Sequence, residues 1–136
     1  MEIAALVMWV LTAVAGARLL VRRLSEGGLR RQGTKVTRYP VALLLGHPAL
    51  GVLALATWVA FLLTDRSVYA WSAFAALVLV ALLGFAMLTR WLSGAGGKHA
   101  RGGEEGFPAV AVVAHGTVAT LTFVLVLLTA ITVSRR

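Results

Sequence analysis

Two histidines stand at matching places in the two halves of this chain. His47 and His115 are 68 residues apart, half of the 136-residue length, and each comes seven residues after a proline, Pro40 or Pro108. A long apolar stretch follows each proline, so at 1.5 Å per residue both imidazoles are expected about 10 Å along a helix. Imidazole nitrogen binds iron and other transition metals, and it also gains and loses a proton near neutral pH. The pair therefore indicates a metal-centred site or a proton-handling site.

The offset of 68 relates other residues as well as the histidines. The same residue type recurs at both positions in the pairs Gly16 and Gly84, Arg22 and Arg90, Leu24-Ser25 and Leu92-Ser93, Pro40 and Pro108. Matches of Ala, Val and Leu arise easily in an apolar chain, whereas matched arginine, serine, proline and histidine in one register do not. The pattern predicts two tandem helix-pair repeats, 1–68 and 69–136, around a pseudo-two-fold axis along the membrane normal.

The composition is that of an integral membrane protein. Hydrophobic residues make up 60% of the chain, and the mean hydropathy is +0.89. Four apolar stretches approach the roughly 20 residues that a helix needs to cross about 30 Å of hydrocarbon. They cover residues 3–21, 41–63, 68–88 and 109–133. We predict an all-α fold, a four-transmembrane-helix bundle that forms one membrane domain, with short connections favouring up-and-down topology.

Basic residues gather around alternate connections. Of the thirteen lysines and arginines, seven flank the first connection and three flank the third: Arg18, Arg22, Arg23, Arg30, Arg31, Lys35, Arg38, Arg90, Lys98 and Arg101. The positive-inside rule places these two connections in the cytoplasm and both termini outside. No aromatic residues are interleaved with the charges of the first connection, so we expect the net charge of +8 to face anionic headgroups of the bilayer, not nucleic acid.

The chain has no cysteine, which excludes thiolate-bound iron–sulfur clusters, zinc thiolate sites and the thioether attachment of c-type haem. A metal or cofactor must therefore use histidine, carboxylate or backbone ligands. If spans two and four are parallel and diagonal, His47 and His115 oppose each other in a dry, apolar interior. Two opposed imidazoles suit the axial ligation of a haem b iron.

Residues near the histidines fit a haem. Gly51, Ala111 and Ala119 lie one helical turn from a histidine, and their small size would leave space for a porphyrin. Arg22 and Arg90 end the first and third spans on the cytoplasmic side. A haem near that surface would direct its propionates toward such cations. Anchoring at the membrane surface is the alternative role of these two arginines.

The segments LLLGHPALGVLAL, around His47, and VVAHGTVATL, around His115, resemble the ligand-bearing helices of small b-type membrane cytochromes, including the cytochrome b561-like group. The resemblance implies one-electron transfer, with a quinol and a redox partner protein as candidate partners. The two-haem members use four core histidines, whereas this chain offers two, so one haem is the most that is implied. The segment from Phe107 to Ile131 also resembles small four-span proteins of high-GC bacteria, which implies the bacterial cytoplasmic membrane.

Two other functions use the same features. The histidines could bind a metal ion or relay protons in a small transporter or channel module, although the carboxylates Glu2, Asp65, Glu104 and Glu105 all lie outside the spans. Alternatively, the chain is a non-catalytic subunit of a larger membrane complex and docks through its basic first connection; a homo-oligomer or a hetero-oligomer is the corresponding assembly. The structural alternative for the histidines is a hydrogen bond between helices. No nucleophile–base–acid set or phosphate-binding loop indicates a soluble-type enzyme.

Overall fold

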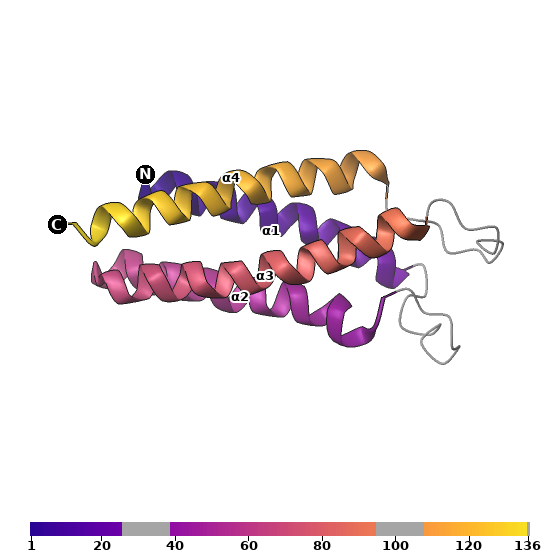
Figure 1. Ribbon diagram of the computed structural model, residues 1–136, viewed down its shortest axis with the longest axis horizontal. Coiled ribbons are helices and arrows are strands. Elements are labelled where there is room, and N and C mark those ends of the chain that lie inside the picture. The colour runs from indigo at the N-terminus through magenta and orange to yellow at the C-terminus, as the bar shows by residue number, and fades with distance from the viewer. Residues whose placement is uncertain (26–38, 95–107, 136) are drawn as a thin grey trace.

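The computed structural model describes residues 1–25, 39–94 and 108–135. In these ranges the chain forms four helices, α1 (Glu2–Ser25), α2 (Val41–Thr64), α3 (Ser67–Gly94) and α4 (Ala109–Val133), which Figure 1 shows as one elongated bundle. Each helix is long and apolar enough to cross a membrane. The structure therefore confirms the all-α, four-helix prediction and indicates a multi-pass membrane protein.

Helices α2 and α4 begin directly after the two prolines. Pro40 and Pro108 occupy the N-cap positions, and the Pro40 carbonyl accepts the Leu44 amide at 3.0 Å while the Pro108 carbonyl accepts the Val112 amide at 3.1 Å. Proline has no N–H to leave unsatisfied and its fixed φ suits the start of a helix. The two histidines therefore occupy the same place in their helices, seven residues after the cap.

Helices α1 and α3 continue beyond the predicted spans. Helix α1 ends at Ser25 and not at residue 21, and α3 ends at Gly94 and not at residue 88. The predicted spans stop where charged residues begin, but arginine and leucine are good helix formers and continue the helices beyond the apolar segments. The additional turns carry Arg22, Arg23 and Arg90.

Successive helices run in opposite directions. The most extensive packing joins α2 to α3 and α1 to α4, while α1 with α2 and α3 with α4 pack less closely. Helices α2 and α4 are thus parallel and face each other across the bundle (Figure 1). We call the end where α1 and α3 finish and α2 and α4 begin the loop end. The opposite end is the turn end, where only Asp65 and Arg66 connect α2 to α3.

The buried core lies mostly toward the turn end. Trp58 is fully buried there, with ring centroids 5.0 Å from Phe61 and 6.1 Å from Trp9. The same cluster contains Ala5, Ala54, Ala70, Ala73, Leu77, Val126, Ala130 and Val133. Among the described residues of the loop-end half, the buried side chains are those of Arg23, Tyr39 and Leu44. The bundle is therefore densely packed at the turn end and thinly packed at the loop end.

Large apolar side chains also cover the outside of the bundle. Ile3, Val52, Leu63, Leu82 and Val110 are each more than half exposed, so that apolar residues from all four helices face outward. In water such a surface would aggregate, whereas in a bilayer it contacts lipid acyl chains. The exterior is therefore suited to contact with lipid.

Candidate functional site

The two histidines meet across the bundle. The ring centroids of His47, on α2, and His115, on α4, lie 6.3 Å apart, and the ring planes are inclined at 75°. Both side chains are half-buried, between the dense core and the loop end. The structure thus brings together two residues, 68 positions apart, that the sequence singled out.

Each imidazole donates a hydrogen bond to the backbone of a neighbouring helix. Nδ1 of His47 lies 3.0 Å from the Val80 carbonyl oxygen on α3, and Nδ1 of His115 lies 3.1 Å from the Thr12 carbonyl oxygen on α1. A carbonyl oxygen only accepts, so Nδ1 must carry the proton in both rings. In a neutral imidazole, Nε2 then holds the free lone pair. Each histidine is therefore in the form that binds a metal or accepts a proton through Nε2.

A glycine lies against each ring. A Cβ atom added to Gly16 would lie 3.0 Å from Cε1 of His115, and one added to Gly84 would lie 3.2 Å from Cε1 of His47. Distances this short leave no room for a larger residue unless the ring moves. By contrast, a Cβ atom added to Gly46 or Gly116, the sequence neighbours of the histidines, would meet no atom within 4 Å. A side chain at Gly16 or Gly84 would thus require the facing imidazole to shift by a few tenths of an ångström.

Each histidine is consequently held by what we call a carbonyl–glycine pair. For His47 the pair is Val80 and Gly84 on α3, and for His115 it is Thr12 and Gly16 on α1. The members are four residues apart in each helix, so they lie one above the other on the same helix face. The carbonyl orients the ring and the glycine lets the two helices approach.

The small residues predicted to make space for a porphyrin lie close to the histidines. A Cβ atom on Gly51 would make an ordinary contact with Val80, 4.0 Å away, so Gly51 adjoins the carbonyl–glycine pair of His47. Ala111 and Ala119 lie one turn to either side of His115 and are partly buried. All three therefore occupy the part of the bundle that contains the histidine pair.

The two predicted propionate partners lie farther from the histidines. Arg22 and Arg90 are exposed, and each stands six residues beyond the glycine of a carbonyl–glycine pair, Gly16 or Gly84. Six residues of helix correspond to about 9 Å along the axis. Along their helices, the two arginines thus stand equally far from a glycine that faces a histidine, toward the loop end.

Sequence reasoning did not identify the carbonyl–glycine pairs. Thr12 and Val80 act through backbone oxygens, which every residue type carries, so their identities give no indication of the role. The signal that could have found them is the offset, because 12 and 80 also differ by 68. Gly16 and Gly84 belong to the set of repeated residues, but nothing in the sequence indicated that they contact the histidines.

The described residues contain no group of three or more His, Asp or Glu side chains that could hold a metal ion. Zinc sites normally use three or four protein ligands. Two imidazole nitrogens thus fall short of the protein ligand set of a typical zinc site.

Comparison with known proteins assigns no role to these residues. No protein-family model, curated protein or solved structure matches the chain. The resemblance to b-type cytochromes therefore stays a prediction, and the chemistry of the site has to follow from the histidine geometry.

We expect both histidines to carry the proton on Nδ1 in the haem-free protein, because each Nδ1 faces a carbonyl oxygen. The measurement is the ¹⁵N NMR spectrum of protein labelled at histidine, in which a protonated and an unprotonated ring nitrogen give well-separated signals. His99→Gln leaves His47 and His115 as the labelled residues. An Nε2-protonated form of either ring would contradict the hydrogen bonds described above.

Proposed function

We propose that this protein is a single-haem b-type membrane cytochrome in which His47 and His115 are the axial ligands. The observation that carries the proposal is the pairing of two imidazoles whose ring centroids are 6.3 Å apart. Two imidazoles bound on opposite sides of one metal, at metal–nitrogen distances of about 2.0–2.1 Å, have ring centres roughly 6 Å apart. If both imidazoles bound one metal, each ring could rotate about its own nitrogen–metal bond without breaking that bond. The 75° angle between the two ring planes is therefore compatible with binding to one metal.

The hydrogen bonds of Nδ1 support the same assignment. Metal-binding histidines usually donate the other ring N–H to a carbonyl or carboxylate, which fixes the tautomer, orients the ring and makes the ligand more basic. His47 and His115 both have such a partner, the carbonyls of Val80 and Thr12. The protein would thus hold two ligands in the reactive form before the cofactor binds.

The distribution of buried side chains favours a large, flat ligand. The turn-end half of the bundle is closely packed, whereas the half that contains the histidines buries few of its described residues. Gly51, Ala111 and Ala119 would contribute little bulk beside an inserted ring. We propose that Arg22 and Arg90 pair with the propionates at the loop end, in charge-assisted hydrogen bonds.

When bound, the haem supplies a reversible one-electron iron couple. If His47 and His115 both bound the iron, they would leave no coordination position open to oxygen or peroxide, which favours electron transfer. The contribution of the chain is to orient two imidazoles through the hydrogen bonds of Nδ1 and to surround them with apolar helices. A quinol and a redox partner protein are the proposed electron donor and acceptor.

We also propose that the two halves are tandem repeats around a pseudo-two-fold axis along the membrane normal. The supporting observation is that each element of the site has a counterpart 68 residues away: the histidines, the acceptors Thr12 and Val80, and the glycines Gly16 and Gly84. We further propose a location in the bacterial cytoplasmic membrane. The charge bias supports an orientation with the loop end in the cytoplasm and both termini outside.

The first experiment is an absorbance spectrum of the protein purified in detergent after expression with sufficient haem, recorded oxidised and then reduced with dithionite. We expect a Soret band, sharp bands in the reduced state, and one haem per chain from the pyridine haemochrome. A featureless spectrum would refute the haem. The functions to test next would then be metal or proton transport by the histidine pair, or a subunit role in a larger complex.

A further inference from the structure

Helix α1 has a much shorter uncharged segment than the helices beside it. Between Glu2 and Arg18 it contains residues 3–17, which correspond to about 22 Å of helix. Helices α2 and α4 contain no Asp, Glu, Lys or Arg over 24 and 25 residues, about 36 Å each. The hydrocarbon region is about 30 Å thick. When α2 and α4 span it, Arg18 lies within hydrocarbon depth.

Arg18 needs an anionic partner at this depth. Its side chain is exposed, and the structure gives it no ion pair within the described ranges. The described carboxylate side chains, Glu2 and Asp65, are at the turn end, whereas Arg18 is in the loop-end half of α1. A charged side chain in the membrane is tolerated when it reaches toward the interface and pairs with an opposite charge. The partner of Arg18 must therefore come from outside the described chain.

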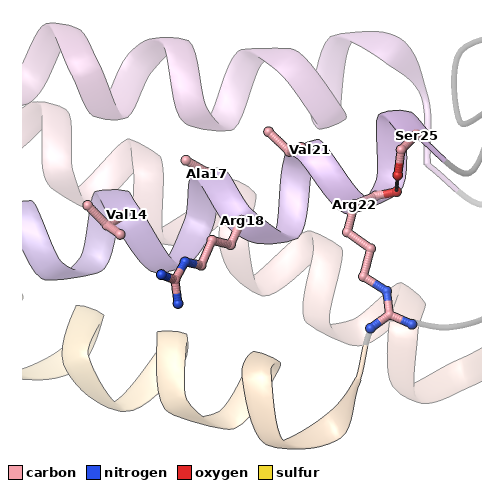
Figure 2. Close-up of a pocket in the computed structure, with 6 residues that line it drawn as sticks. All are labelled: Val14, Ala17, Arg18, Val21, Arg22 and Ser25. Carbon is pink, nitrogen blue, oxygen red and sulfur yellow. Dashed lines mark hydrogen bonds between the residues drawn. The ribbon is translucent and has the colours of Figure 1, made fainter.

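The surroundings of Arg18 have the chemistry of a lipid site. A groove on α1 is lined by Val14, Ala17, Arg18, Val21, Arg22 and Ser25. Figure 2 shows the side chains of Arg18 and Arg22 extending to the same side of α1. They are four residues apart, about 6 Å along the helix. Val14, Ala17 and Val21 are apolar. The Ser25 hydroxyl donates to the Arg22 carbonyl at 2.8 Å, so its proton is already engaged.

We propose that this groove binds one anionic phospholipid from the leaflet at the loop end. The lipid phosphate pairs with the guanidinium group of Arg18, and an acyl chain lies along Val14, Ala17 and Val21. Arginine presents a planar set of donors that matches phosphate oxygens. A zwitterionic headgroup is a poorer ligand, because its cation offsets the attraction of its phosphate for the arginine. Charge complementarity thus selects the anionic lipid.

The test is native mass spectrometry of the purified protein, with phosphatidylglycerol or phosphatidylcholine of the same chain length added to the detergent. We expect phosphatidylglycerol to remain bound to a several-fold larger fraction of the wild-type protein. Arg18→Gln should lower that fraction about fivefold, since one basic residue near an anionic lipid contributes about that factor. The matched control is Arg66→Gln, an arginine at the turn end, which should bind as the wild type does.

Three outcomes would overturn the proposal: equal retention of the two lipids by the wild-type protein, unchanged retention by Arg18→Gln, or displacement of phosphatidylglycerol by inorganic phosphate at equal concentration. The last would mean that the groove binds a free anion and not a lipid. The wild-type comparison needs no variant, so it stands even if Arg18→Gln does not fold. Arg18 has no part in the proposed haem site, so haem content and lipid retention report on the two proposals separately.

Discussion

Replacement of His115 by alanine should remove haem from the purified protein, and His47→Ala should do the same. In the proposed site, each variant would remove one of the two histidine ligands and leave the iron without a protein ligand on that side. Loss of residues that merely orient a metal ligand typically lowers metal affinity 10–100-fold, so loss of the ligand should lower the haem content at least tenfold. The measurement is the Soret absorbance and the haem per chain after purification.

The control for these variants is His99→Ala, which should retain the wild-type haem content. Loss of the hydrogen bond between His115 and Thr12 should cost only about 0.6 kcal/mol, an average value for such bonds between membrane helices. His115→Ala should therefore keep its helical circular dichroism and its elution volume. Added imidazole should restore part of the absorbance, because it can occupy the vacated position. Full haem content in either alanine variant would refute the proposed ligation.

Substitution of valine for Gly16 or Gly84 should displace a histidine without changing any ligand. A Cβ at these positions would lie 3.0 or 3.2 Å from Cε1 of the facing imidazole, and the further methyl groups of valine would add to the clash. The ring must then move away from the carbonyl that orients it. We expect haem affinity to fall about tenfold, the lower end of the effect of lost orienting contacts. A haem titration of the apoprotein measures this change.

The matched controls are Gly116→Val and Gly46→Val, which introduce the same residue beside His115 and His47 in sequence. A Cβ at either position meets open space, so both variants should bind haem as the wild type does. The comparison separates displacement of the ring from a general effect of valine on the helices. Equal affinities in all four variants would show that the glycine contacts do not position the ligands.

Much of the fold follows from the sequence because membrane crossing requires long apolar segments. The four helices lie where the hydropathy places them, and the prolines mark the starts of α2 and α4. The ends of α1 and α3 could not be predicted from hydropathy. Hydropathy indicates where the apolar segment ends, whereas a helix ends where its backbone hydrogen bonding stops.

The site was predictable only in part. The histidines were found because polar side chains are rare in apolar helices and because the offset relates them. Thr12 and Val80 could not be found from residue type, since the acceptor is the backbone. The close approach at Gly16 and Gly84 depends on how α1 packs on α4 and α3 on α2, which is a property of the assembled bundle.

The two halves of the histidine site, so alike in geometry, must form at different times during folding. His47 and Val80 are 33 residues apart and belong to helices joined by a two-residue turn, whereas His115 and Thr12 are 103 residues apart. The entropy lost on closing a chain segment grows with its length, so contacts within the α2–α3 hairpin can form as soon as these helices are inserted. The contact between His115 and Thr12 can form only after α4 has packed on α1. A ribosome-bound chain that ends before α4 would thus already hold one oriented imidazole, while the second imidazole would be oriented only after α4 has packed on α1.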